Sequence, residues 1–238
     1  MVNDEPSELY GIAIMPAGIG GMIAFDAPIS GGGYVTPSLI QSAYSASNSA
    51  SFTSNQTVGN LNVVFVICQG GKTGYSATVT DTIGNTYSYY GTNVIPAAQN
   101  MTVIFYCQSI KATTTTNVVT VGSGGSYVIY VAEFAGGVWS SDTGVINGTN
   151  GDGGGSSWAF TSTSLTTATA GELVVGFIWA SGGTIVTPSG WSVVFAPGNT
   201  YETDYKVPAG AGSISYIPTG SWGGVSTSIW IAVGAWKP

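Results

Sequence analysis

Four carboxylates are the side chains in this sequence best suited to catalysis. Glu133 and Glu172 lie in or beside runs typical of β-strands, and Glu202 and Asp204 lie close together in a third run. Glycosidases place two Asp or Glu side chains on either side of the scissile bond, so paired carboxylates are the catalytic arrangement that remains open to this chain. Glu133 at a solvent-exposed strand end and Glu172 at the start of a strand would be the non-catalytic interpretation, which we favour.

Composition excludes the other common catalytic and metal-binding sets. The chain has 238 residues and no histidine, so Ser-His-Asp and Cys-His catalysis lack their base. Two cysteines alone cannot complete a usual tetrahedral zinc site. Lys72 follows two glycines but lacks the upstream glycine spacing of a phosphate-binding loop. We therefore expect no enzyme activity and no catalytic, cofactor-binding or metal site.

Two groups of residues have side chains that could bind calcium or sugars. Asp81 with Asn85, and the carboxylates and amides of one Gly-rich stretch, have the oxygen chemistry of calcium loops, but such residues usually form ordinary turns. Aromatic rings near predicted loops can stack on sugars, although core packing is the more common role. The loop residues are Asp142, Asn147, Asn150 and Asp152, and the aromatic residues are Trp139, Trp158, Trp191 and Trp222.

Two kinds of covalent modification are suggested by the sequence. Asn55, Asn100 and Asn147 begin Asn-x-Ser/Thr triplets at strand edges or in loops and are candidates for N-glycosylation. Cys68 and Cys107 each lie inside a strand-like run. They fit a disulfide between neighbouring strands in an oxidising compartment, and they fit equally well two buried thiols that pack as small hydrophobic groups.

The charge balance limits the partners of this chain. Eleven carboxylates stand against four lysines, for a net charge of −7. Nucleic-acid binding is not expected, because phosphate neutralisation requires a Lys/Arg patch. The run 10–29 contains five Gly, two Pro and Asp26, so direct membrane insertion is not expected either. Residues 1–9 have no basic segment of a signal peptide, which leaves a processed chain or release by another route, as for virion proteins.

Composition and a long internal echo predict an all-β fold. The chain is rich in Gly, Ser, Thr, Val and Tyr and poor in strong helix formers. Two apolar runs, 59–71 and 171–183, match along one face of a strand and end in Gly-Gly. The matching residues are Leu61, Val63, Phe65 and Ile67 in the first run and Leu173, Val175, Phe177 and Trp179 in the second.

We predict an antiparallel β-sandwich, jelly-roll-like, built from two pseudo-repeated halves. The half-repeats span 36–137 and 157–238, and an exposed loop at 138–156 joins them. Both faces of the two echoing strands are apolar, which indicates burial on both sides. This favours one body in which the halves interleave into two sheets over two tandem sandwiches.

Residues 1–35 form an N-terminal arm outside the repeat. Two short apolar runs are separated by Gly and Pro, and Pro16 and Pro28 exclude a continuous helix. Such an arm can add as a strand to a neighbouring subunit, or it can fold back on its own domain; we favour the exchange. The residues expected to contact a neighbour are Tyr10, Ile12, Ile14, Met22, Ile23 and Phe25.

Several segments resemble a repeat-bearing β-sandwich domain of bacterial and archaeal surface proteins and phage structural proteins. The resemblance covers about residues 36–238 and is carried by PSLIQS (37–42), TVGNLNVV (57–64), TDTIGNTY (80–87), VAEFAG (131–136) and AGELVV (170–175). It implies a fold and a surface setting and brings no catalytic residues. The composition also resembles that of archaeal extracellular filament subunits, in which an N-terminal strand is donated to the next subunit.

These observations predict a structural protein. The first hypothesis is a subunit of an extracellular pilus- or thread-like filament that assembles by N-terminal strand exchange. The alternatives are a virion structural protein (capsid, turret or spike) and a carbohydrate-binding adhesive module. The expected partners are copies of the chain itself and surface glycans, and the expected location is extracellular, on a cell or virion surface.

Overall fold

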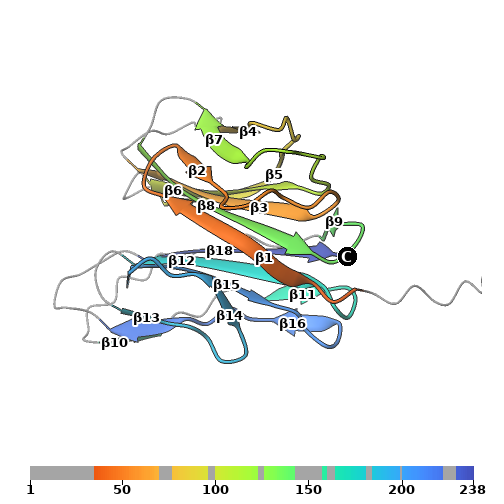
Figure 1. The fold of residues 1–238 in the computed structure, drawn as a ribbon. Coiled ribbons are helices and arrows are strands. Elements are labelled where there is room, and N and C mark those ends of the chain that lie inside the picture. Colours follow the sequence, from red (N-terminus) through yellow and green to blue (C-terminus); the bar gives the residue numbers. More distant parts are fainter. Residues whose placement is uncertain are drawn as a thin grey trace, which may run out of the picture. The chain divides into compact units, whose positions relative to one another are not determined.

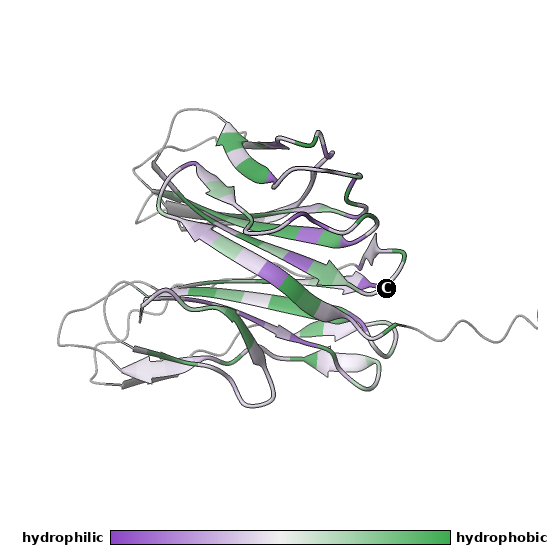
Figure 2. Cartoon of the chain, viewed as in Figure 1, coloured by the Kyte–Doolittle hydropathy of each residue, from purple (hydrophilic) through white to green (hydrophobic). Residues whose placement is uncertain are grey.

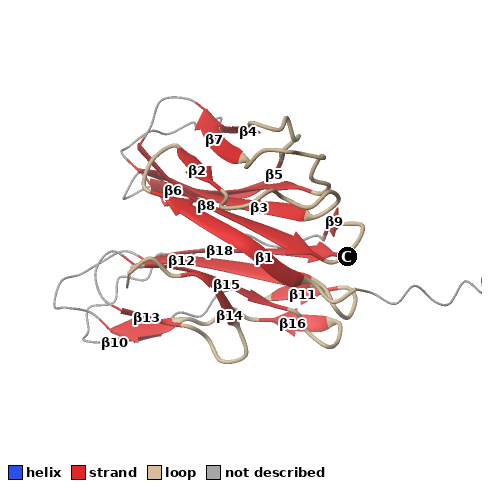
Figure 3. Ribbon diagram, viewed as in Figure 1, coloured by secondary structure: helices blue, strands red, loops and turns tan. Residues whose placement is uncertain are grey.

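The computed structural model describes residues 35–69, 77–95, 100–122, 126–142, 157–159, 164–180, 184–198, 200–221 and 229–238. The chain divides into two compact units, Met1–Gly33 and Tyr34–Pro238, and the first lies outside the described residues. The described part of the second unit consists of strands, turns and irregular segments without a helix (Figure 3). None of its segments is a helix that could span a membrane. The predicted all-β class is confirmed.

Two five-stranded antiparallel sheets form the centre of this unit. The first has the order β1-β8-β3-β6-β5 and the second β14-β15-β12-β18-β9. The strands of the first are β1 (Ser38–Ser45), β3 (Leu61–Gln69), β5 (Ser88–Ile95), β6 (Asn100–Cys107) and β8 (Ser126–Ala135). Those of the second are β9 (Ser140–Ser141), β12 (Leu173–Ala180), β14 (Ser192–Phe195), β15 (Tyr201–Lys206) and β18 (Ile229–Lys237).

Three smaller antiparallel sheets complete the described strands. Their orders are β2-β7-β4, β10-β17-β13 and β11-β16. The strands of these sheets are β2 (Ser49–Ser51), β4 (Thr78–Asp81), β7 (Val118–Gly122), β10 (Ser157–Ala159), β11 (Leu165–Thr167), β13 (Thr184–Val186), β16 (Gly212–Ile214) and β17 (Thr219–Ser221).

Strand pairing is nested in both stretches of the chain. Over residues 38–135, β1 pairs with β8, β2 with β7 and β3 with β6. Over residues 140–237, β9 pairs with β18, β10 with β17, β11 with β16 and β12 with β15. Each stretch therefore has the connectivity of one long antiparallel hairpin that is folded over on itself.

The two five-stranded sheets pack against each other through an aromatic-rich core. The alternating residues of β3 and β12 that the sequence placed on one face are all buried there, and that prediction is confirmed. The rings of Phe65 and Phe177 stack across the layer with centroids 5.5 Å apart, and Tyr130 lies 5.1 Å from Phe177. Figure 1 shows the sheet of β3 and β8 facing that of β12 and β18. Aromatic pairs of this kind contribute about 0.5–1.5 kcal/mol beyond their buried area.

The outer face of each five-stranded sheet has a core of its own. Val64, Val66 and Cys68 of β3 are buried with residues of β2 and β7. Val174 and Ile178 of β12 are buried with Leu165, Trp191 and Tyr216. Hydrophobic residues (green) consequently extend along most of the central strands in Figure 2. Burial on both faces explains why these strands are apolar on both faces.

The predicted interleaving of the two halves is wrong. No described sheet combines strands from 38–135 with strands from 140–237. The double-sided burial that suggested interleaving arises instead because one face of each central strand contacts its own small sheet and the other contacts the opposite half.

The start of the predicted exposed loop is also partly structured. β9 lies within it, and Trp139 and Asp142 are buried, with exposed fractions of 4% and 8%. The Trp139 ring fits because residue 136 is a glycine: a Cβ there would lie 2.7 Å from the ring. Residues 143–156 of this loop lie outside the described residues.

Gly176 provides a direct test of packing in the second half. Its Cβ would lie 2.8 Å from the fully buried Tyr216 ring, so we expect Gly176→Ala to lower the free energy of unfolding by about 1–3 kcal/mol through overpacking. Gly210→Ala, where a Cβ meets no atom within 4 Å, is the matched control and is expected to change stability little. Urea unfolding of both variants measures the difference; equal midpoints would contradict this packing.

Candidate functional site

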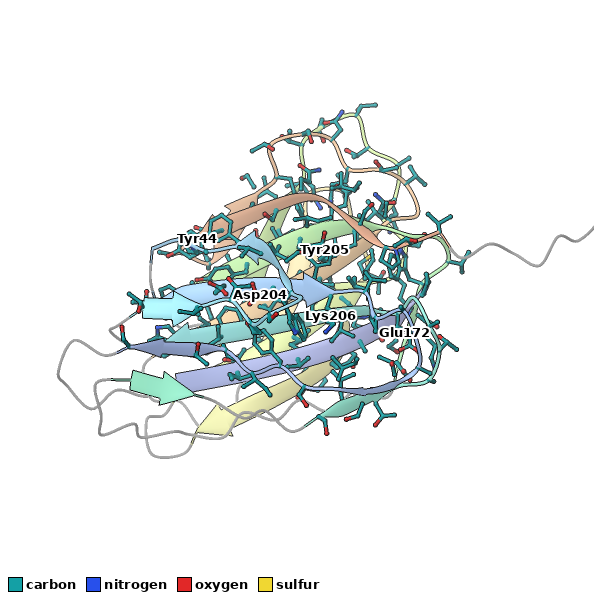
Figure 4. All side chains as sticks on the ribbon, turned by 90° about the horizontal axis from the view of Figure 1, so that it is seen from below. Tyr44, Glu172, Asp204, Tyr205 and Lys206 are labelled. Carbon is teal, nitrogen blue, oxygen red and sulfur yellow. The ribbon has the colours of Figure 1, made fainter. Side chains whose placement is uncertain are left out.

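The four candidate carboxylates occupy three separate places, and all are buried. Glu133, Glu172 and Asp204 have exposed fractions of 0%, and Glu202 has 5%. Figure 4 shows Asp204 and Glu172 well apart in the second half of the chain. Glu202 and Asp204 share one face of β15, as their spacing of two residues in a strand requires.

Glu133 holds the chain together locally. Its Oε1 accepts hydrogen bonds from the Thr57 amide at 2.8 Å and Asn60 Nδ2 at 2.7 Å, and its Oε2 accepts one from Gln41 Nε2 at 2.7 Å. The expected position of Glu133 near solvent is therefore wrong. The carboxylate can be buried because three donors from earlier parts of the chain compensate the loss of water.

Asp81 is the centre of a second polar cluster in the first half. Its carboxylate accepts hydrogen bonds from the amide and side chain of Asn85, from the Tyr87 hydroxyl and from Asn117 Nδ2, at 2.7–2.9 Å. Asn117 and Asn62 in turn bond to the side chain of Gln56. Calcium requires a shell of oxygen ligands, whereas N–H and O–H donors surround Asp81. The Asp81–Asn85 calcium alternative is therefore not supported.

Asp142, Glu172 and Lys237 meet at one end of the second half. Lys237 Nζ lies 3.0 Å from Asp142 Oδ1. Glu172 Oε1 accepts hydrogen bonds from the amide and hydroxyl of Thr169 at 2.5 and 2.9 Å. Burial, reinforced by the neighbouring Asp142, raises the pKa of Glu172. The other residues of the second calcium candidate, Asn147, Asn150 and Asp152, lie outside the described residues.

Glu202 and Asp204 form a buried carboxyl pair beneath Tyr216. The Tyr216 hydroxyl donates to Asp204 Oδ2 at 2.6 Å. Burial raises the pKa of Asp204 to about 8, and the adjacent Glu202 adds to this rise while the Tyr216 hydrogen bond opposes it. The same carboxylate raises the pKa of the Tyr216 hydroxyl, which is itself buried. The apolar surroundings and the neighbouring carboxyl both favour the protonated form of Asp204.

None of these carboxyls has the geometry of a glycosidase pair. Such enzymes place a sugar ring, and in inverting enzymes a water as well, between two carboxyls in an accessible cleft. Glu202 and Asp204 are adjacent in the core of the second half, beside Trp191 and Tyr216. Across the described ranges, no group of three His, Cys, Asp or Glu side chains could hold a metal ion.

The aromatic candidates for sugar stacking divide into two sets. Trp139 and Trp191 are buried, with exposed fractions of 4% and 9%, so they pack in cores and cannot form a stacking platform. Trp222 and the side chain of Trp158 lie outside the described residues.

The two cysteines are free and buried. In the pairing of β3 with β6, Cys68 lies opposite Met101 whereas Cys107 lies opposite Asn62, at the other end of the ladder. Six residues along a strand span on the order of 20 Å, far beyond the separation that a disulfide can bridge. The disulfide alternative is therefore wrong. Burial raises the pKa of Cys68 to about 12 and also raises that of Cys107, so both thiols are unreactive.

The other predicted site residues are described only in part. Asn55 is exposed and accessible to a glycosylating enzyme, and Asn100 begins β6. Asn147 lies outside the described residues. So do the arm residues Tyr10, Ile12, Ile14, Met22, Ile23 and Phe25.

Comparison with known proteins finds no relative. No family model, no curated protein and no solved structure matches the chain. Functional assignment therefore depends on the geometry of the chain itself.

Sequence reasoning missed the partners that decide what the carboxyls do. Tyr216, Gln56, Asn117 and Lys237 were not singled out, because each meets its partner through strand pairing and loop packing rather than local spacing. Gly176 is the residue from which one of these partners could have been predicted. A glycine inside an otherwise apolar strand indicates that another group packs closely against it, and here that group is Tyr216.

The raised pKa of Asp204 predicts that the protein is more stable at acidic than at alkaline pH. The folded pKa is about 8 and that of an unfolded aspartate about 3.9, so the folded state holds the proton over this window. The contribution of Asp204 to the free energy of unfolding is therefore complete below about pH 4 and is lost as the pH rises through 8. The raised pKa of Glu172 acts in the same direction. We expect the urea midpoint to fall between pH 5 and pH 8.5.

Asp204→Asn isolates this contribution. Asparagine keeps the size of the side chain and stays neutral. The urea midpoint of the variant should therefore depend less on pH than that of the wild type, and the remaining dependence should come from Glu172. A wild-type midpoint that rises between pH 5 and pH 8.5, or an unchanged slope in Asp204→Asn, would contradict the raised pKa of Asp204.

Proposed function

We propose that this chain is a non-catalytic structural subunit of an extracellular surface assembly, a pilus- or thread-like filament. Subunits would join by exchange of the N-terminal strand. The observation that carries the proposal is the pair of nested strand sets, packed back to back, in which one smaller sheet covers the first five-stranded sheet and two smaller sheets accompany the second.

The strand orders support a duplicated jelly-roll-like sandwich. β8-β3-β6-β5 of the first sheet corresponds in order to β18-β12-β15-β14 of the second. Opposite the echoing residues Leu61 and Leu173 lie the large buried residues Phe134 and Trp236. Known jelly rolls include viral capsid and lectin domains, which act by assembly and by recognition.

The polar interior supports a structural role. Glu133 and Asp81 each accept at least three internal hydrogen bonds. Such fully bonded buried networks specify one arrangement of the surrounding chain. The hydrogen bonds of these carboxylates fix the loops between strands. A rigid structural subunit needs loops that are fixed in this way.

The sheet edges supply sites at which a donated strand could add. β1 and β5 are the outer strands of the first sheet, and β14 is an outer strand of the second. Ile40 of β1 and Val193 of β14 are about half exposed, at 50% and 46%. An edge strand with unpaired backbone groups and apolar side chains is a template for strand addition. β1 also directly follows the arm in sequence, so the donating and accepting segments belong to one chain.

A virion structural protein is the second candidate, and the nested strand order favours it. The first stretch has eight strands, β1–β8, in two sheets with a nested connectivity, as in the jelly rolls of viral capsids. A shell subunit and a filament subunit would use the same arm and the same sheet edges. The two candidates differ in the symmetry of the assembly, so the morphology of the particle separates them.

The arm provides the test of assembly. Full-length chain is expected to form polymers or shells, whereas Ile12→Asp/Ile14→Asp, which charges the first apolar run, is expected to stay monomeric. Ser7→Asp/Ser30→Asp adds the same charge outside the two apolar runs and is the matched control. Size-exclusion chromatography with light scattering and negative-stain microscopy give the readout. Full-length chain that remains monomeric at high concentration would rule out strand exchange.

A further inference from the structure

The cluster of Asp142, Glu172 and Lys237 brings an amine and two carboxyls together in the body of the second half. Lys237 Nζ lies 3.0 Å from Asp142 Oδ1, and the exposed fractions of the two side chains are 33% and 4%. Glu172 is fully buried. The three residues belong to different segments: Asp142 directly follows β9, Glu172 directly precedes β12, and Lys237 ends β18.

Backbone contacts hold Asp142 in place beside the lysine. The Asp142 amide donates to the Ala235 carbonyl at 3.0 Å, which continues the pairing of β9 with β18. The Tyr90 hydroxyl donates to the Asp142 carbonyl at 3.3 Å and accepts from the Ala235 amide at 3.0 Å. The Ala168 amide donates to Asp142 Oδ2 at 3.3 Å, so Oδ1 is the oxygen that faces Lys237.

Glu172 places a proton next to the same carboxyl. Thr169 supplies two donors to its Oε1, whereas Oε2 receives none from the described amides and hydroxyls. A hydrogen bond joins the side chains of Glu172 and Asp142. Two carboxyls can share a hydrogen bond only when one carries a proton. Burial and the proximity of Asp142 raise the pKa of Glu172, which favours that state.

We propose that Lys237 and Asp142 join covalently in an intramolecular amide bond, with Glu172 as the residue that relays the proton. Nζ of Lys237 and Oδ1 of Asp142 are 3.0 Å apart, so the amine and the carboxyl that it would attack are already in contact. Holding two groups together in this way replaces an intermolecular encounter by an intramolecular step. The backbone contacts of Asp142 fix the geometry before the reaction.

The reaction needs no additional reagent. Nζ of Lys237 passes one proton to an Asp142 oxygen, attacks Cγ of Asp142 and forms a C–N bond. A proton from Glu172 passes to the same oxygen, which then carries two protons and leaves as water when the C–O bond breaks. Glu172 recovers its proton from the amine nitrogen. The net change converts an ammonium and a carboxylate into one amide and one water, and no group is oxidised or reduced.

The other described lysine contacts differ in chemistry. Lys111 Nζ donates to the backbone carbonyl of Gly84, where formation of a new amide would displace the peptide nitrogen and cleave the chain. Lys237 contacts a side-chain carboxyl, whose oxygen is free to leave. The bond would join the first strand of the second half to its last strand. Unfolding of β18 from its C-terminal end would then no longer separate it from β9.

The mass of the intact, denatured chain tests the proposal. The wild-type protein, after folding, is expected to weigh less than its sequence by one water molecule in most molecules. Lys237→Arg preserves the positive charge and the ion pair but cannot form the amide, so it should have its full mass. Glu172→Gln preserves the size of the side chain and removes the relay, so most of its molecules should also have full mass. Lys206→Arg is the matched control and should show the wild-type deficit.

Two results would overturn the bond. One is a wild-type mass equal to that of the sequence; the other is a deficit that persists in Lys237→Arg, which would arise from dehydration elsewhere. Fragmentation of the wild-type chain needs no variant to fold and locates the bond directly. A branched fragment that contains both Asp142 and Lys237 is the expected product, and a deficit carried by a linear fragment would contradict the assignment.

Discussion

The packing of the two five-stranded sheets on each other is the interaction on which the rest of the structure depends. Phe65 and Phe177 stack across this layer, and Tyr90 and Trp236 meet in it with centroids 5.1 Å apart. Each sheet also closes its own core on the opposite face. Removing the shared layer would expose an entire aromatic face of both sheets, at roughly 25 cal/mol for each Å² returned to water. Neither half is therefore expected to remain folded without the other.

Buried polar groups stabilise the segments that flank the strands of the two packed sheets. Glu133 fixes the segment before β3 to β8 through Thr57 and Asn60, and Asp142 fixes the end of β9 to β18. Loops in an all-β protein leave backbone groups unpaired, and a side-chain carboxylate in the interior can satisfy several of them at once. Most of the described carboxyls therefore act inside the fold.

The sequence predicted the central strands and missed the partners of the carboxyls. β3 lies within the apolar run 59–71 that the sequence singled out, because a long strand buried on both faces leaves a continuous apolar pattern. β9, β11 and β17 have only two or three residues, too few to show a period, and they were missed. The same distinction applies to the candidate sites. Glu202 and Asp204 are two residues apart and were identified together, whereas Lys237 and Asp142 meet only through the pairing of β9 with β18.

The claim that the two halves form one body on a shared aromatic core is tested most directly by calorimetry. Differential scanning calorimetry of the monomeric chain at low concentration compares the measured enthalpy of unfolding with the van't Hoff enthalpy. A shared core predicts a single transition in which the two enthalpies agree. Two resolved transitions, or a measured enthalpy about twice the van't Hoff value, would show that the halves unfold independently and would contradict this account.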